Sequence, residues 1–354
     1  MSSDSIILFK EIEKRMSGDQ MMNADVLIIG AGLSGVMAAR ELEAAGISVM
    51  IIDKGRSVGG RMATRRIGDG RADHGAQFFT VRDERFQQMV DELIDEGLIY
   101  VWSNGFSDGS LATDITDGHP RYVVREGMNA LPRYLAQPLL NVRVDTKIVT
   151  ATCDDNGWIL QDDEGTLYTG KTLLMTSPVP QSLQILDEGA TVLAREDFDK
   201  LNVIEYAPCL AGMFKVRGVV TLPQPGAIQR KDTNITWIGD NRQKGISPDD
   251  TVVTVQASET YSTQMWNSPD ERILAALETA LEVFIREGAV IEEAQLKRWR
   301  YSRPLNGLED RYYIADNTPL LMFAGDAFGG PRVEGAILSG VEAGSKLVEL
   351  VQSS

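Results

Sequence analysis

The feature that most constrains the fold is a glycine pattern within residues 27–66, LIIGAGLSGVMAARELEAAGISVMIIDKGRSVGGRMATRR. Gly30, Gly32 and Gly35 have the spacing G-x-G-x-x-G and follow the apolar run 26–29, which predicts a strand buried on both faces. These glycines permit a tight turn, a close approach of the backbone to a pyrophosphate, and close packing of strand and helix. The helix predicted over 34–45 begins at the turn, where its free N–H groups attract phosphate.

Asp53 completes a βαβ unit. A second apolar run, 49–52, predicts another strand, and Asp53 follows it directly. A carboxylate at this point can accept hydrogen bonds from both ribose hydroxyls and would repel a 2′-phosphate. Ser34 adds a hydroxyl at the helix start. The unit therefore predicts dinucleotide binding, since a purely structural glycine turn does not explain Asp53, but these residues alone do not distinguish a nicotinamide enzyme from a flavoprotein.

Composition excludes several other classes. A net charge of −16 argues against a nucleic-acid partner. The only cysteines, Cys153 and Cys209, lack CxxC or metal-type spacing, which excludes a disulfide scaffold and leads us to expect a cytoplasmic location. The two histidines, His74 and His119, are too few for a typical zinc centre, so no metal is expected. No run approaches the ~18 apolar residues of a membrane span, and no membrane partner is expected.

The rest of the chain alternates between two kinds of segment. Predicted elements are helices over 83–97, 269–287 (with Ser268 as N-cap) and 333–351, a hairpin at Asn156-Gly157 within the meander 140–177, β-rich sequence over 190–260, and a strand over 320–324. We therefore expect an α/β fold with two interleaved domains. The expected parts are an N-terminal extension, 1–24, with a short helix around 5–16; a Rossmann-type dinucleotide-binding domain, 25–82, 125–185 and 296–354; and a mostly antiparallel β-sheet substrate domain, 83–124 and 186–295.

Gly59-Gly60-Arg61 indicates which dinucleotide is bound. This order, in which a strand is followed by a ribose-binding acid and then by GGR, resembles the FAD-dependent amine oxidase superfamily. In that superfamily the arginine of GGR reaches the FAD pyrophosphate, and Arg61 matches it. Ala324-Gly325-Asp326, at the end of the last predicted strand, matches the place where that family has an aspartate bonded to the ribityl chain. Arg65 and Arg66 are either further phosphate contacts or solvated surface charges.

A closer resemblance is to the renalase-type flavoproteins, especially their bacterial members, over about residues 25–350. It rests on the order and spacing of GGRM after Asp53-Lys54, 72-ADHGAQFFT-80, 127-GMNALPRYLA-136, 176-TSPVPQ-181, 298-RWRYSRP-304, and AGDAFGG with RVEGAILSG within 324–340. The resemblance implies a p-hydroxybenzoate-hydroxylase-like fold with non-covalently bound FAD. It also implies oxidation of isomeric dihydronicotinamides, 2- or 6-dihydro-NAD(P), by hydride transfer to flavin N5, with dioxygen as the reoxidant and hydrogen peroxide as the product.

The same resemblance assigns residues to the cofactor and to the substrate cavity. Gly75, Ala76, Gln77 and Phe78 should line the isoalloxazine, and Ile148 should touch the adenine side. Glu334 begins a helix directed at the flavin, or is only a first-turn carboxylate. Trp299, Arg300 and Tyr301 should lie near the flavin and substrate, whereas His74 is either catalytic or packed beneath the flavin. The remaining residues expected at the cofactor are Leu33, Lys54, Gly60, Met62, Gly325, Arg332 and Val333.

The chemistry leaves alternatives open. Oxidising a dihydropyridine requires no proton removal, so a site without an obvious buried base can perform it. No second G-x-G-x-x-G occurs, so a nicotinamide would enter only as the substrate. The alternatives are a flavin amine oxidase, a desaturase of isoprenoid or porphyrin substrates, and, from another class, a non-catalytic flavin-binding redox sensor.

Overall fold

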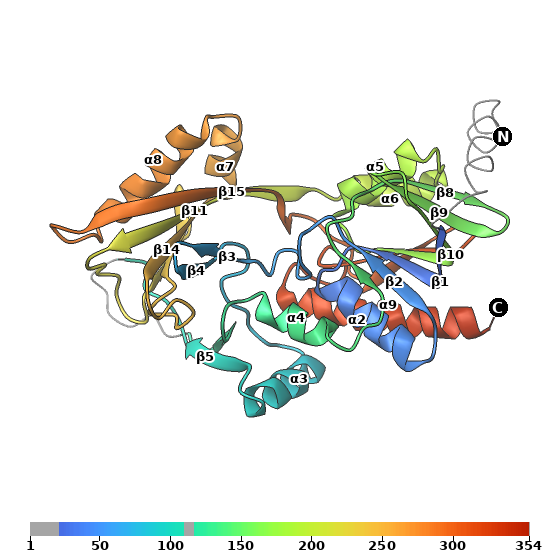
Figure 1. Ribbon diagram of the computed structural model, residues 1–354, viewed down its shortest axis with the longest axis horizontal. Helices are drawn as coiled ribbons and strands as arrows, with labels where there is room; N and C mark the ends of the chain where they lie inside the picture. The colour runs from blue at the N-terminus through green and yellow to red at the C-terminus, as the bar shows by residue number, and fades with distance from the viewer. Residues whose placement is uncertain (1–20, 110–116, 354) are drawn as a thin grey trace.

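The computed structural model describes residues 21–109 and 117–353, and it consists of two units, each built on its own β-sheet. The first unit is a largely parallel sheet with helices on both faces, and the second is an antiparallel sheet (Figure 1). Two long strands, β11 (Tyr206–Arg217) and β15 (Val290–Pro304), run from the second unit toward the first (Figure 1). The helix expected around 5–16 lies outside the described residues.

The first sheet has eight strands in the order β16-β17-β10-β1-β2-β7, with β9 paired to β10 and β8 paired to β9. Strands β1, β2, β7, β10 and β17 are parallel, whereas the β8–β9 hairpin turns at Asn156-Gly157 as predicted. The strands are β1 (Met21–Ile29), β2 (Val49–Ile52), β7 (Val142–Arg143), β8 (Ile148–Asp154), β9 (Gly157–Asp162), β10 (Leu167–Met175), β16 (Tyr312–Ala315) and β17 (Leu321–Ala324). Strand β1 begins before the predicted start at Val26, because residues 21–24 pair with β10 despite the polar Asn23.

Helices cover both faces of this sheet. Alternate strand residues such as Ile28 and Leu27 are fully buried on opposite faces. Helices α2 (Leu33–Ala44) and α9 (Val333–Gln352) pack on one face; α5 (Val179–Glu188) and α6 (Arg195–Asn202) pack on the other. A parallel sheet buried on both faces is what the continuous apolar runs predicted.

The second sheet has the order β12-β13-β14-β11-β15. Its outer face carries Phe214 and Val255, which pack against Leu277 of α8, while its inner face carries Ala211 and Met213 and faces the first unit. Its remaining elements are β12 (Ala227–Gln229), β13 (Ile235–Asp240), β14 (Thr251–Ala257), α7 (Glu259–Met265) and α8 (Asp270–Glu282). Helix α8 begins at Asp270 with Pro269 as N-cap, so the predicted N-cap at Ser268 is wrong; the Ser268 hydroxyl instead contacts the Met265 sulfur.

The segments between residues 64 and 136 lie between and beside the two sheets. The hairpin of β3 (Thr64–Ile67) and β4 (Gly70–Asp73) packs on the second sheet through Ile67 and Ala72, against Met213 and Val252. The other elements pack together beneath α9 in one core cluster; they are α3 (Glu84–Asp95), β5 (Ile99–Ser103), β6 (Arg121–Val124) and α4 (Ala130–Ala136).

The expected domain limits therefore need correction. The limit at residue 296 falls inside β15, which pairs with β11 from Val290 to Pro304 without leaving the second sheet. Residues 186–204 belong with the first unit, since Leu186 and Leu201 are buried against its sheet. Residues 83–124 also pack largely against the first unit, through α3 and α9. The charged sequence of 297–303 hid the strand, because pattern analysis finds strands by apolar residues.

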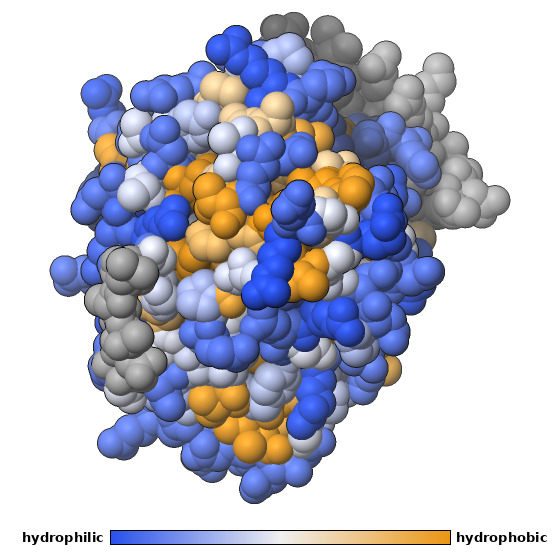
Figure 2. Space-filling view, turned by 90° about the vertical axis from the view of Figure 1, so that its left-hand side faces the viewer, coloured by the Kyte–Doolittle hydropathy of each residue, from blue (hydrophilic) through white to orange (hydrophobic). Residues whose placement is uncertain are grey.

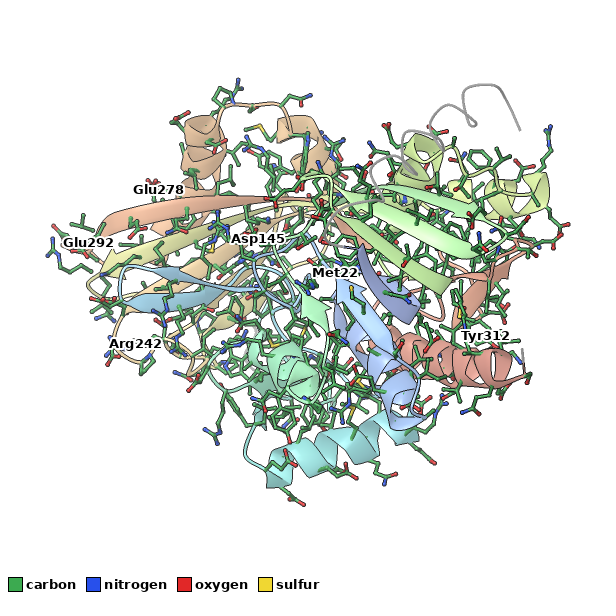
Figure 3. The ribbon with its side chains drawn as sticks, turned by 45° about the vertical axis from the view of Figure 1, so that its right-hand side comes forward. Met22, Asp145, Arg242, Glu278, Glu292 and Tyr312 are labelled. Carbon is green, nitrogen blue, oxygen red and sulfur yellow. The ribbon has the colours of Figure 1, made fainter. Side chains whose placement is uncertain are left out.

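The two units lie at opposite ends of the molecule (Figure 1). In Figure 3, Glu292 and Arg242 lie at the outer end of the second unit, and Tyr312 lies at the opposite end of the molecule. Viewed from the second unit's end, the surface is hydrophilic with apolar groups gathered near its middle (Figure 2). Across residues 21–109 and 117–353, no helix combines the length and apolar character needed to cross a bilayer.

Candidate active site

The glycine turn lies at the carboxyl end of β1, where the order of the first sheet reverses. Strand β2 lies on one side of β1 and β10 on the other, and sheets of this kind bind ligands at such a reversal. A Cβ at Gly35 would lie 2.0 Å from the Gly30 carbonyl oxygen. Only glycine therefore allows α2 to begin this close to the strand.

Asp53 is held in place by two backbone amides. Its Oδ2 accepts a hydrogen bond from Ala31 N at 2.6 Å, and its Oδ1 accepts one from Gly55 N at 2.6 Å. Each carboxylate oxygen can accept a further hydrogen bond. The carboxylate therefore has free capacity for two hydroxyl groups, and its contact with a ribose stays a prediction.

Glycines border open space in front of this turn. A Cβ at Gly32 or Gly330 would meet no atom within 4 Å, and one at Gly60 would approach only the Gly32 Cα, at 3.6 Å. Gly32 is the N-cap of α2, and the first amides of a helix have no partner within it. The residues present fit a diphosphate, because an open backbone surface rich in N–H donors binds phosphate.

Arg61 joins the two ends of the chain. Its Nη1 donates to Asp326 Oδ2 at 2.6 Å and its Nη2 to Asp326 Oδ1 at 2.7 Å, a two-pronged ion pair. The guanidinium lies 5.9 Å from the Tyr206 ring, which stands edge-on to Tyr301. The structure thus brings together two residues that the sequence placed separately at the cofactor; their bonds to the cofactor itself remain predictions.

The segment 73–77 is held by the second sheet. Its carbonyl oxygens accept hydrogen bonds from side chains of that sheet and its loops: Thr254 donates to Asp73, Trp299 and Gln256 to His74, Gln256 to Gly75, and Lys244 to Gln77. The path of the segment predicted to line the isoalloxazine is therefore set by the other unit.

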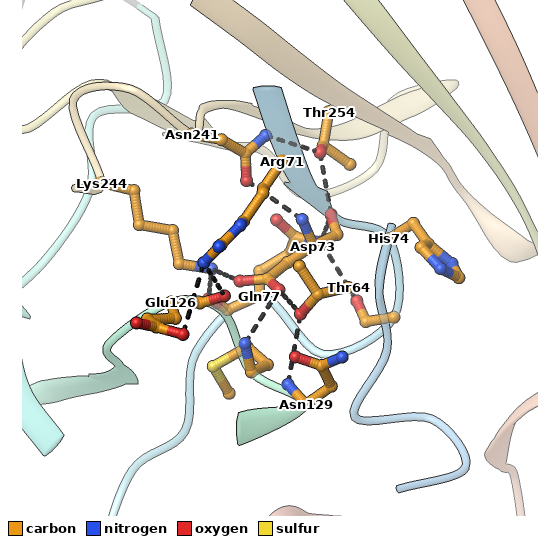
Figure 4. A network of polar contacts seen from close by, with 12 residues as sticks. Thr64, Arg71, Asp73, His74, Gln77, Glu126, Asn129, Asn241, Lys244 and Thr254 are labelled. Carbon is orange, nitrogen blue, oxygen red and sulfur yellow. Dashed lines mark hydrogen bonds and ion pairs between the residues drawn. The ribbon is translucent and has the colours of Figure 1, made fainter. Parts of the chain in front are cut away.

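A buried ion pair lies at the centre of this arrangement (Figure 4). Lys244 Nζ donates to Asp73 Oδ2 at 2.5 Å, and neither side chain is exposed by more than 1%. The other carboxylate oxygen of Asp73 accepts hydrogen bonds from the Thr64 hydroxyl and Met128 N. Burial lowers the pKa of Lys244. This pair was not predicted from the sequence, because no local sequence motif links two residues that are 171 positions apart.

His74 lies outside that network, with its ring turned away from Asp73 (Figure 4). The ring stacks on Trp299, with centroids 5.4 Å apart and planes 20° apart. Burial, followed by the charges of Arg65 and Lys297, lowers the pKa of His74 to about 3. The imidazole is therefore neutral near pH 7 and packed against Trp299, which favours the packed alternative over the catalytic one.

A cavity of about 230 Å³ opens beside segment 75–78. Phe78 and Trp237 form aromatic walls, and Arg230 is the one ionisable side chain in the lining that the described residues 21–109 and 117–353 provide. The lining residues are Gly75, Ala76, Gln77, Phe78, Gln229, Arg230, Thr236, Trp237 and Gln256. The cavity thus lies between the predicted flavin segment and β12, β13 and β14.

Comparison with known proteins identifies the family. The family model for flavin containing amine oxidoreductases matches residues 95–347, and the model for NAD(P)-binding Rossmann-like domains matches residues 28–93. The chain belongs to the flavin-containing amine oxidoreductases. It is an FAD-dependent oxidoreductase.

Individual relatives agree with this assignment. Mouse (Mus musculus) renalase is 24% identical over 335 residues, which cover 89% of this chain and 96% of renalase. Putrescine oxidase of Kocuria rosea is 31% identical over 81 residues, 23% of this chain and 17% of that protein. The solved structure of wild-type putrescine oxidase bound to putrescine has a TM-score of 0.68 at 14% identity and covers 93% of this chain and 100% of that chain. The fold of this flavoprotein is therefore the FAD-binding fold that the sequence predicted.

The side chains of Ser34 and Arg300 make other contacts than those predicted, and Glu334 fits the alternative of a first-turn carboxylate. The Ser34 hydroxyl donates to the Ala336 carbonyl at 2.6 Å, so it joins α2 to α9 and is not directed at a phosphate. The Glu334 carboxylate accepts hydrogen bonds from the amides of residues 82 and 83 at 2.6 and 3.0 Å, so it braces the loop before α3. Arg300 lies on the outer face of β15, 5.5 Å from the Trp266 ring, because adjacent strand residues face opposite ways.

The remaining predicted residues vary in exposure. Ile148 is buried in the core of the first sheet, so only its backbone can serve an adenine, as expected. Leu33 and Met62 are buried beneath the glycine turn, and Val333 begins α9. Lys54 and Arg332 are exposed, and Gly325 is buried at the end of β17. Their contacts with FAD remain predictions.

Within residues 21–109 and 117–353, no group of three or more His, Cys, Asp or Glu side chains is arranged to hold a metal.

Proposed function

We propose that this flavoprotein is a renalase-type oxidase that removes a hydride from an isomeric dihydronicotinamide, 2- or 6-dihydro-NAD(P), with dioxygen as the final acceptor and hydrogen peroxide as the product. FAD, when bound without a covalent link, supplies the two-electron acceptor at N5. The similarity to renalase across most of both chains supports this proposal.

The observation that carries the proposal is the chemistry of the cavity beside segment 75–78. Among the residues that the structure describes, its lining has no carboxylate, histidine or lysine side chain that could remove a proton. In a dihydropyridine the C–H bond breaks with both electrons leaving as hydride, and the ring becomes an aromatic pyridinium. No base is needed for that step, so positioning of the ring is sufficient.

The cavity also favours a planar neutral ring over an amine. Phe78 and Trp237 offer apolar walls, and Gln229 and Gln256 offer amide groups for a carboxamide. Arg230 would repel a cationic amine, the form in which most alkylamines exist at neutral pH. An amine oxidase would need a carboxylate or an aromatic cage for that cation.

The test is to mix the flavoprotein anaerobically with 2- and 6-dihydro-NAD(P), ordinary NADH, a panel of amines including putrescine, and a porphyrinogen, and to follow the absorbance of the oxidised flavin. We expect rapid bleaching by the dihydronicotinamide isomers alone. Bleaching by amines would indicate an amine oxidase, and bleaching by the porphyrinogen would indicate a desaturase. Full flavin content without bleaching by any of these compounds would indicate a redox sensor.

A pair of tryptophan variants locates the reaction. Trp237 lines the cavity, whereas Trp266 lies on the outer side of the same sheet beside Arg300. Trp237→Leu should slow bleaching by the isomers at least about tenfold, the effect of losing a ring-positioning wall. Trp266→Leu is the control for general damage to the second unit; equal slowing by both variants would contradict the cavity assignment.

A further inference from the structure

Two carbonyl groups of segment 73–77 point toward the inner face of the second sheet. The His74 carbonyl oxygen accepts a hydrogen bond from the indole N–H of Trp299 at 2.7 Å. The Gly75 carbonyl oxygen accepts one from Gln256 Nε2 at 2.9 Å. Side chains of β15 and β14 therefore fix the orientation of two successive peptide groups in the segment.

The amide groups of the same peptides point the opposite way. A trans peptide is planar, so each N–H points away from the carbonyl of the residue before it. The Gly75 N–H therefore points away from the second sheet, because the His74 carbonyl points toward it. The neighbouring Ala76 N–H shows where this direction leads, since it donates to the Arg61 carbonyl oxygen at 3.0 Å. Arg61 ends the GGR sequence expected at FAD, so the Gly75 amide faces the cofactor side of the segment.

Lys244 fixes a further amide of the segment. Its Nζ donates to the Gln77 carbonyl oxygen and to Asp73 Oδ2, each at 2.5 Å, so one ammonium group holds both ends of the segment (Figure 4). The Phe78 N–H points away from the Gln77 carbonyl and therefore away from Lys244. In a buried site, a cation at the carbonyl oxygen polarises the whole peptide group, which makes the Phe78 N–H a stronger donor.

Neither of these two amides has an acceptor among the described residues. Gly75 N and Phe78 N form no hydrogen bond there, whereas the intervening Ala76 N and the preceding His74 N are both bonded to backbone carbonyls at 3.0 Å. Gly75 and Phe78 are only half-buried, and both line the cavity. Folded proteins leave few backbone N–H groups unpaired unless water or a ligand accepts the bond. The two amides are therefore open to a bound molecule.

We propose that the Gly75 and Phe78 amides form a donor pair for polar atoms of the isoalloxazine, and that Lys244 is a positioning residue that orients the Phe78 amide. A hydride that reaches FAD brings one proton and two electrons, and the ring then carries a negative charge. Donors that are fixed before the reaction stabilise such a charge without rearrangement. The inference rests on the predicted place of the ring beside segment 75–78. It goes beyond the proposed function, because it holds for whichever compound supplies the hydride.

The first test measures the two-electron reduction potential of bound FAD, with dithionite and reference dyes and without any substrate. The double variant Asp73→Asn/Lys244→Met removes one negative and one positive charge, so a shift reports the lost orientation and polarisation of the amide and not a change in net charge. We expect the reduced flavin to be stabilised about tenfold less, the usual effect of one hydrogen bond to a charged group. For a two-electron couple this makes the potential about 30 mV more negative. FAD content should be unchanged.

The control for this measurement is Lys215→Met. It breaks an ion pair of 3.1 Å with Asp250 elsewhere on the second sheet. Its reduction potential should match that of the unmodified protein, because no hydrogen bond of Lys215 reaches segment 73–77.

The second test observes the Phe78 amide directly by NMR. In FAD-loaded protein labelled with ¹⁵N-phenylalanine, the Phe78 amide proton should shift downfield when dithionite reduces the flavin. Phe78→Leu identifies the signal by removing it. The amide of Phe214, which packs in the core on the outer face of the second sheet, should not move.

Several results would overturn the proposal. These are an unchanged potential in Asp73→Asn/Lys244→Met, an equal shift in Lys215→Met, loss of FAD from the double variant, or a Phe78 amide that does not respond to reduction. If the double variant does not fold, the NMR response of the unmodified protein decides. If the dihydronicotinamide isomers fail to bleach the flavin while the potential shifts as expected, the proposed function fails and the donor pair stands.

Discussion

The phosphate end and the ring end of the site are built in different ways. At the phosphate end, Gly32, Asp53 and the start of α2 come from one short stretch, and backbone amides make most of the contacts. At the ring end, segment 73–77 is held by side chains of the second sheet, including Lys244 and Trp299. The residues expected to bind the diphosphate and ribose, which all dinucleotides share, lie close together in the sequence. The residues expected to position the reacting ring come from distant parts of the chain.

This difference implies separable functions. Changes at the phosphate end should alter how tightly FAD is held, and changes at the ring end should alter stability and the environment of the flavin ring. Variants at each end test this separation. It would be contradicted if variants at the phosphate end changed stability alone and variants at the ring end changed FAD affinity alone.

The largest expected effect is on the buried pair at the ring end. Lys244→Met leaves the carboxylate of Asp73 buried without its cation, which should lower the free energy of unfolding by about 3–5 kcal/mol. Urea unfolding of the FAD-loaded protein measures it. The double variant Asp73→Asn/Lys244→Met removes both charges and should recover a large part of the loss. If the single and double variants are equally unstable, the ion pair is not the cause.

The next effect is at the phosphate end. Arg61→Ala removes the cation predicted to face the diphosphate and should weaken FAD binding about 10- to 100-fold, as expected for a charged hydrogen bond. FAD release, followed by flavin fluorescence, measures it. Arg300→Ala, on the outer face of β15, is the matched control and should retain FAD. Full flavin affinity in Arg61→Ala would refute the assignment.

His74 gives a pH-dependent effect at the ring end. Its pKa is about 3 in the folded protein and about 6.5 in the unfolded chain, so below pH 6.5 the unfolded state binds the proton first. Stability should therefore fall as the pH drops from about 6.5 to 3, with His74 contributing at most about 1.4 kcal/mol per pH unit. His74→Gln should flatten the fall, whereas His119→Gln, an exposed histidine, should leave it unchanged. Identical pH slopes in the two variants would contradict the burial of His74.

The smallest effect tests a corrected residue at the phosphate end. The Ser34 hydroxyl bonds to the Ala336 carbonyl, so Ser34→Ala should cost about 1 kcal/mol of stability, the usual value of one such bond. FAD affinity should change less than about twofold. A tenfold loss of FAD affinity without loss of stability would indicate that the Ser34 hydroxyl contacts a phosphate of FAD instead.

Local patterns predicted most of the first unit. The βαβ start, the Asn156-Gly157 hairpin and α9 appeared where turn chemistry and apolar periodicity placed them. Strand β15 was not predicted, because its sequence is largely polar or charged, including Gln295 and Lys297 on its inner face. Apolar patterns therefore miss a strand whose inward-facing side chains are polar.

Long-range contacts account for the rest of what the sequence could not predict. Asp73 and Lys244 are 171 residues apart, and a single sequence carries no signal that couples them. Glu334 could be placed at a helix start, but whether its carboxylate faced the cofactor or the loop before α3 depended on how α9 packs. Residue types fixed the chemistry that was possible, and packing decided between the alternatives.

The most direct test of the account is a single-turnover stoichiometry. One equivalent of 6-dihydro-NAD, added anaerobically to the FAD-loaded protein, should bleach the flavin completely and release one equivalent of NAD⁺. Admission of dioxygen should then restore the absorbance and yield one equivalent of hydrogen peroxide. An unchanged flavin spectrum with the isomer, or complete bleaching by putrescine with release of ammonium, would contradict it.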